Sequence, residues 1–182
     1  LSQTAEGALG KVGDMLQRMR ELAVQSANAT NGTSDRANLN AEYQALGTEV
    51  VRTLANTKFN GLAILGANAG TLSFQVGANA GETVDVVTTR LDTAVSITGA
   101  TGGAITDATL AGTAMTNIDT ALTAVNGERA LYGATQNRFD AIIGTLQVAA
   151  ENQAAAKSRI TDADFAAETA NLSRAQILQQ AG

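Results

Sequence analysis

The sequence predicts a mainly α-helical chain with a small β region: an α+β fold, built as an elongated rod of long antiparallel, coiled-coil-like helices plus a β-hairpin subregion. Three observations predict it. Two segments, near the two ends of the chain, repeat apolar residues at alternating steps of three and four, as a helix packed along one face does. The chain contains no proline, so nothing forces a kink in a long helix. Between these segments lies glycine-rich, alternating sequence, which is typical of strands and turns.

Residues 1–57 are predicted to form a pair of antiparallel helices. The turn-forming run NATNGT, residues 28–33, separates them, and a loop this short places two helices side by side. Thr33 or Ser34 is expected to cap the second helix, which ends near Thr57. The apolar stripe of the first helix comprises Leu1, Ala5, Ala8, Val12, Met15, Met19, Leu22 and Ser26, widened by Leu9, Leu16 and Ala23. The second helix carries Leu39, Tyr43, Leu46, Val50 and Leu54.

The middle of the chain changes character. In residues 58–92 we expect a small β region, with a short strand in FNGLAIL that is entered by an Asn-Gly turn. Two further strands are predicted at residues 71–76 and 83–88, around a glycine-rich loop. Residues 93–113 are small, polar and low in complexity, so we expect an exposed, poorly specified excursion there.

Residues 114–182 return to the helical repeat, over about 40 residues or roughly 60 Å of helix. Arg129 and Gln136 fall within the predicted apolar stripe, where a polar residue usually fixes helix register. The run TDAD, residues 161–164, is typical of a capped start to a last helix. The predicted stripe comprises Met115, Ile118, Leu122, Val125, Arg129, Tyr132, Gln136, Phe139, Ile143, Leu146, Ala150 and Gln153. The last helix carries Phe165, Leu172, Ile177 and Leu178.

The composition disfavours several classes of function. The net charge of −5 makes binding to a nucleic acid backbone unexpected. The sequence contains no run of about 18 apolar residues, so we do not expect it to insert into a membrane. Without histidine or cysteine, the chain lacks the usual general base and any thiolate. Asp162, Asp164 and Glu168 are better explained by helix capping than by a cation site. We therefore predict no catalytic residues, no cofactor and no metal, and an enzyme is the least favoured hypothesis.

Two features of the first helix leave alternatives open. Gly7, Gly10 and Gly13 recur every third residue on the side away from the stripe; they are either tolerated helix glycines or a surface for close approach by another helix, which we favour. Gln17, Arg18, Glu21 and Gln25 point outward in LQRMRELAVQSAN, either as an ordinary solvated surface or as an interface.

Helix geometry links this cluster to the second helix. Arg18 and Glu42 each lie about twelve residues from the intervening turn, so both stand roughly 18 Å from it. They are therefore expected to form one patch, in which a guanidinium fork beside a carboxylate suits a polar interface anchor.

Several segments, in order, resemble the bacterial flagellin family. They are LQRMRELAVQSAN, TKFNGLAIL, FQVGANAGETV, GATQNRF and SRITDADFAAETANLSRAQILQQAG. The resemblance implies the family's D1 core, without the terminal D0 helices. Residues 1–57 would then be the N-terminal helix pair of D1, 58–92 its small β region, and 93–113 a minimal or absent outer domain. Residues 114–182 would be the C-terminal long helix and the start of the linker to D0. Because the sequence begins and ends inside helical patterns, we expect it to be a fragment.

The resemblance also implies a function. It predicts a secreted structural subunit of the extracellular flagellar filament, which polymerises through D0 and D1 contacts and serves motility. Implied partners are other flagellin subunits, the flagellar type III export apparatus and, for the monomer, Toll-like receptor 5. Tyr132 stands where the family often has leucine, and Ile118 and Leu122 also belong to the predicted stripe, which leaves a packing role open. The implied receptor and subunit interface comprises Gln17, Arg18, Glu21, Leu22, Gln25, Glu42, Ile118, Leu122, Tyr132 and Arg138.

Two other functions remain as alternatives. A hook–filament junction protein shares flagellin-like ends, but FQVGANAGETV together with QNRF favours flagellin. A flagellin-like cell-surface adhesin that binds polysaccharide could use the polar excursion, but the aromatic content of 3% is low for a sugar-binding surface.

Overall fold

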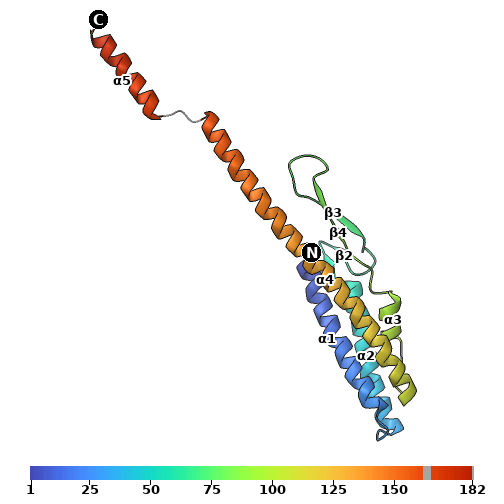
Figure 1. Cartoon of the computed structure of the whole chain (residues 1–182). Helices are drawn as coiled ribbons and strands as arrows, with labels where there is room; N and C mark the ends of the chain where they lie inside the picture. The colour runs from blue at the N-terminus through green and yellow to red at the C-terminus, as the bar shows by residue number, and fades with distance from the viewer. Residues whose placement is uncertain (162–164, 182) are drawn as a thin grey trace. The chain divides into compact units, whose positions relative to one another are not determined.

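The computed structural model describes residues 1–161 and 165–181, apart from the side chain of Ala166. The chain divides into two compact units, Leu1–Phe139 and Asp140–Gly182. Long helices and two small antiparallel sheets make up the described residues, which confirms the predicted mainly α class with a small β region (Figure 1). None of the helices described is both long and apolar enough to cross a membrane.

Helices α1 (Ser2–Ala27) and α2 (Thr33–Asn56) form the predicted antiparallel pair and lie side by side in Figure 1. Because apolar residues recur at three–four spacing, one face of each helix is removed from water. On α1 the buried residues are Ala5, Leu9, Val12, Leu16, Met19, Leu22, Ala23 and Ser26. On α2 they are Tyr43, Gly47, Val50 and Leu54.

The start of α2 differs from the prediction. Its N-cap is Gly32, not Thr33 or Ser34. The backbone N–H of Gly32 donates to the Asp35 carboxylate at 3.1 Å, which is the acidic half of a capping box. With Gly32 as the cap, α2 begins at Thr33, earlier than either predicted cap would allow. In the preceding loop, the Asn28 side chain accepts the backbone N–H of Thr30 at 3.1 Å in an Asx turn.

The two sheets are hairpins. Strands β1 (Lys58–Phe59) and β2 (Leu62–Ala63) flank Asn60 and Gly61, whose φ values of +49° and +82° are those of a type I′ turn. The single strand predicted here was therefore wrong, because the Asn-Gly pair turns the chain between two short strands. Strands β3 (Thr71–Gln75) and β4 (Thr83–Val87) match the predicted hairpin to within one residue at each end.

The excursion expected at residues 93–113 is contradicted by the structure. Helix α3 (Val95–Thr101) lies there, and Ile97, Ala100 and Ile105 are fully buried. A Cβ atom placed on Gly47 of α2 would lie 2.8 Å from the Thr101 carbonyl oxygen, so α2 and α3 are in close contact. The segment is therefore a packed part of the core, and the absence of a side chain at Gly47 lets α3 approach α2.

Helix α4 (Ala108–Thr161) contains 54 residues and contributes to both units. Arg129 does not lie in the apolar stripe as predicted; it is exposed and pairs with Glu6. Further along, Ile143 and Leu146 are 49% and 41% exposed. Helix α5 (Phe165–Ala181) follows, and the predicted capping residues 162–164 lie outside the described residues. The buried residues of α4 are Ala111, Ala114, Ile118, Ala121, Val125 and Tyr132.

One hydrophobic cluster joins α1, α2, α3 and the first part of α4. Two buried side-chain hydrogen bonds and one aromatic contact support it. The Tyr43 hydroxyl donates to the Ala100 carbonyl at 2.5 Å, and the Ser26 hydroxyl donates to the Ile105 carbonyl. The rings of Phe74 on β3 and Phe139 on α4 meet edge to face at 5.9 Å. These contacts tie α2 to α3, α1 to the segment that precedes α4, and β3 to α4.

Candidate interaction surface

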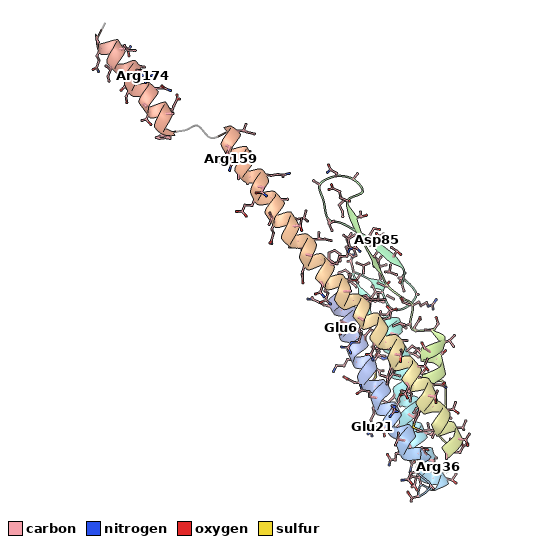
Figure 2. All side chains as sticks on the ribbon, viewed as in Figure 1. Glu6, Glu21, Arg36, Asp85, Arg159 and Arg174 are labelled. Atoms are coloured by element: carbon pink, nitrogen blue, oxygen red, sulfur yellow. The ribbon has the colours of Figure 1, made fainter. Side chains whose placement is uncertain are left out.

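The outward cluster on α1 is built around Arg18. Its Nε donates to Glu42 Oε1 on α2 at 2.9 Å, and its Nη1 donates to Glu21 Oε2 at 3.0 Å. The structure thus brings together Arg18 and Glu42, as their equal separation from the turn predicts. We call Gln17, Arg18, Glu21, Gln25 and Glu42 the α1–α2 polar surface; Glu21 is labelled in Figure 2.

Solvent exposure sets the energetics of this surface. The side chains of Arg18, Glu21 and Glu42 are 50%, 68% and 47% exposed, so water and salt screen their attraction. The hydrogen bond to Glu21, followed by that to Glu42, raises the pKa of Arg18 above its ordinary value. The network therefore contributes little to stability, but it presents a permanent cation flanked by two carboxylates.

A shallow groove adjoins these residues, with a volume of about 440 Å³. Two of its residues, Arg20 and Val24, were missed by the sequence analysis. Val24 is 49% exposed, and Arg20 pairs with Asp119 of α4 at 2.7 Å. The signal for both was present in helical spacing, because Arg20 and Val24 stand four apart beside Gln17 and Glu21. The groove is lined by Gln17, Arg20, Glu21, Val24 and Gln25.

The remaining predicted interface residues are distributed differently. Leu22, Ile118 and Tyr132 are at most 1% exposed, so they present no surface to a partner in this conformation. Leu122 is half-buried against the core, and Arg138 is exposed on α4. Because Leu22 is buried, the exposed apolar residue of this region is Val24, which lines the groove together with Gln17 and Glu21.

The glycines of α1 meet open space. A Cβ atom added at Gly7, Gly10 or Gly13 would have no neighbour within 4 Å. The close approach expected there is therefore not made by any of the helices that the structure describes. The surface remains available to another molecule.

The described residues offer little for catalysis. They contain no group of three or more acidic residues placed to hold a metal ion. Burial raises the pKa of Tyr43 and of Tyr132 to about 12, so neither phenol is ionised near neutral pH. What the surface can do chemically is donate and accept hydrogen bonds with a macromolecular partner.

Long helices, one elongated core and charged side chains that face solvent define the class of helical structural and interaction proteins. The sequence model for the N-terminal helical region of bacterial flagellin matches residues 1–70, and that for the C-terminal helical region matches residues 115–182. The chain belongs to the bacterial flagellin family, whose members are structural proteins rather than enzymes.

Curated relatives agree with this assignment. The chain is 46% identical over 181 residues to a flagellin of Halalkalibacterium halodurans, covering 100% of this chain and 66% of the relative. It is 36% identical to flagellin FlaB2 of Treponema pallidum, with 99% and 68% covered. It is also 36% identical to the flagellar filament 30.7 kDa core protein of Treponema maltophilum, with 98% and 67% covered. The chain thus spans about two thirds of the length of these relatives.

Solved structures share the fold. The crystal structure of Bacillus cereus flagellin matches with a TM-score of 0.69 and 32% identity, over 85% of this chain and 89% of that one. FliC from Burkholderia pseudomallei matches with a TM-score of 0.64 and 24% identity, over 75% and 98%, which shows the fold alone. Family and relatives together support a structural subunit of the flagellar filament, located outside the cell, as the role of the chain.

Proposed function

We propose that this chain is the helical core of a flagellin that polymerises into the extracellular flagellar filament and drives motility as a purely structural subunit. The observation that carries the proposal is the family match at both ends of the chain, over residues 1–70 and 115–182. Relatives named as flagellar filament core proteins support it further. Export through the flagellar type III apparatus is part of the proposal, because a filament subunit must leave the cell.

Exposed features of the chain fit assembly. Leu172, Ile177 and Leu178 of α5 are 58%, 66% and 68% exposed, and burying such side chains is favourable. Gly7, Gly10 and Gly13 offer a smooth helix surface for close packing. In the assembled filament, these surfaces would be covered by neighbouring subunits or by the further residues that longer flagellins carry.

Electron microscopy of the full-length parent under polymerising conditions tests the filament role. Long, regular filaments are the expected result. The 182-residue chain alone should stay soluble and should add nothing to existing filament seeds. A full-length parent that remains monomeric under conditions in which a known flagellin polymerises would overturn the proposal. A glycan-binding assay on the same protein tests the adhesin alternative. Binding to a polysaccharide would support that alternative.

For the monomer, we propose that the α1–α2 polar surface contacts Toll-like receptor 5. The supporting observation is the arrangement of Arg18 between Glu21 and Glu42, two exposed carboxylates on adjacent helices. Hydrogen bonds hold the guanidinium in place, so less side-chain freedom is lost on binding. Val24 supplies exposed apolar area in the adjoining groove, which Glu21 also lines. Binding of the isolated chain to the receptor ectodomain, measured by surface plasmon resonance, tests this second role.

A further inference from the structure

The dipeptide Asn-Gly occurs in the chain at residues 31–32, 60–61 and 126–127. In this dipeptide an asparagine side chain readily reacts with its own backbone, because glycine carries no side chain to shield the nitrogen that follows the asparagine. The copies lie in different settings: the loop before α2, the turn between β1 and β2, and the interior of α4. They differ in the hydrogen bonding of the group that must react, the glycine N–H.

Hydrogen bonds restrain two of the copies. The Gly32 N–H donates to the Asp35 carboxylate at 3.1 Å, and the side-chain amide of Asn31 donates to the Gln25 carbonyl. Gly127 lies inside α4, where backbone N–H groups donate along the helix. In both copies the glycine nitrogen can react only after its hydrogen bond breaks.

The copy between β1 and β2 lacks these restraints. Asn60 and Gly61 are both exposed and form the two central positions of the type I′ turn. Among the residues that the structure describes, the Gly61 N–H has no hydrogen-bond acceptor and the Asn60 side chain has no partner. The two groups that must react are therefore both open to solvent and belong to adjacent residues.

The hairpin is also built to open at this end. Its two strands pair only at Lys58 with Ala63 and at Phe59 with Leu62, and so small a sheet is marginally stable by itself. The Ile64 N–H donates to the Thr57 carbonyl at 3.1 Å and holds the base of the hairpin. The turn can therefore change its dihedral angles without unfolding the rest of the chain.

We propose that Asn60 is a site of spontaneous deamidation, with water as the only co-reactant. The Gly61 nitrogen gives its proton to a solvent base and forms a bond to the Asn60 side-chain carbon Cγ. The Cγ–Nδ2 bond breaks, and ammonia leaves with a proton from water. Water then opens the cyclic imide at either carbonyl, which gives aspartate or isoaspartate. The net change is asparagine plus water to the acid plus ammonia, with no oxidation or reduction.

The modification changes the surface around the turn. Phe59 and Leu62, which flank it as a cross-strand pair, are 38% and 41% exposed. Either product places a negative charge between these two apolar side chains. Isoaspartate also moves a methylene group from the side chain into the backbone, which a two-residue turn cannot absorb without distortion. This modification site is independent of the proposed filament and receptor roles.

Peptide mapping of the full chain tests the site. The folded chain is incubated in ¹⁸O-labelled water, so that only asparagines that react in this period take up the label, and is then digested in ordinary water. Trypsin places the three Asn-Gly pairs on separate peptides, residues 21–36, 59–90 and 91–129. Asn60 should convert at least about tenfold faster than Asn31 or Asn126, because only those two must first break a hydrogen bond. Conversion of Asn31 or Asn126 at the rate of Asn60 or faster would overturn the proposal.

The unfolded chain provides the reference. In concentrated urea the three pairs lose their structural differences, so all three should convert at similar rates. The ranking found in the folded chain then belongs to the fold and not to the neighbouring sequence. An Asn60 that reacts faster in urea but is inert in the folded chain would show that the turn protects it, and would also overturn the proposal.

Removing a restraint tests the physical reason. Asp35→Ala frees the Gly32 N–H, so it should accelerate conversion of Asn31 severalfold and leave Asn60 unchanged. Glu49→Ala is the matched control, because this exposed acid of α2 pairs with Arg52 and not with a glycine N–H; it should change none of the rates. Circular dichroism confirms that both variants fold. No acceleration at Asn31 in a folded Asp35→Ala chain would contradict the role assigned to the free glycine N–H.

Discussion

The Arg18 guanidinium of α1 donates to the Glu42 carboxylate of α2 at 2.9 Å, across residues 24 positions apart in the sequence. This bond crosses the seam between two helices on their solvent side. Arg18 Nη1 also donates a hydrogen bond at 3.0 Å to Oε2 of Glu21, which lies about one helical turn further along α1. The cation is thus fixed without being buried, an arrangement better suited to recognition than to stability.

Replacing Arg18 tests the receptor proposal. Arg18→Ala should leave the helical content and the unfolding midpoint nearly unchanged, because exposed helix positions tolerate alanine. Receptor affinity, measured by surface plasmon resonance, should fall by about thirtyfold if Arg18 is a hot spot. Glu42→Ala should weaken binding too, and the double variant should be non-additive.

Arg52 provides the matched control for this experiment. It is an exposed arginine on α2 that also pairs with a carboxylate, Glu49, at 2.7 Å, but it stands ten residues beyond Glu42. Arg52→Ala should bind the receptor like the wild type. Unchanged affinity in a folded Arg18→Ala variant would remove Arg18 from the interface.

The ion pair between Arg20 and Asp119 predicts a pH dependence of stability. The hydrogen bond from Arg20 lowers the pKa of Asp119 below its ordinary value of 3.8. A lowered pKa in the folded state means that the pair stabilises the chain above the unfolded pKa and is lost as pH falls through the folded pKa. Asp119→Asn should therefore be slightly less stable than wild type at pH 6 and equal to it near pH 2, by thermal unfolding. In an Arg20→Gln background, this pH-dependent difference should disappear.

The sequence predicted the long helices because their signal is local. Apolar residues such as Leu9, Leu16 and Val125 recur at helical spacing, and no proline interrupts them. The patch of Arg18 and Glu42 was predictable for the same reason, since helix rise and a short turn place both at one height.

What the sequence could not provide depends on contacts between distant segments. Residues 93–113 look like a loop because small and polar residues surround Ile97 and Ile105, and these two become core only through contacts with distant parts of the chain. The three–four residue spacing places Arg129 in the apolar stripe, but its long side chain reaches outward to Glu6. The groove beside Val24 also depends on which face of α1 the rest of the chain covers.

Core substitutions test the role of α3. Ile97→Ala should lower the free energy of unfolding by about 2–5 kcal/mol, because it leaves a cavity beside α2. Val95, only two residues earlier and 87% exposed, is the control; Val95→Ala should change that free energy by less than about 0.5 kcal/mol. Urea titration followed by circular dichroism measures both. Equal effects of the two substitutions would mean that this segment is the exposed excursion that its composition indicates.

Two glycines should respond to alanine in opposite directions. At Gly47, a Cβ atom would lie 2.8 Å from the Thr101 carbonyl oxygen, a backbone atom that moves only with α3. Gly47→Ala should therefore destabilise the chain by about 1–3 kcal/mol. A Cβ atom placed on Gly10 would have no neighbour within 4 Å. Gly10→Ala should therefore stabilise α1 by up to about 1 kcal/mol through the higher helix propensity of alanine. Urea unfolding of the two variants measures the difference.

The same Gly10→Ala variant also tests filament packing. If the glycine surface of α1 receives a helix of another subunit at close range, a methyl group there should impair polymerisation of the full-length parent while the monomer becomes more stable. Alanine at Lys11, an exposed neighbour whose side chain is 80% accessible, controls for surface change alone. Normal filament growth by Gly10→Ala, seen by electron microscopy, would limit these glycines to ordinary solvated helix positions.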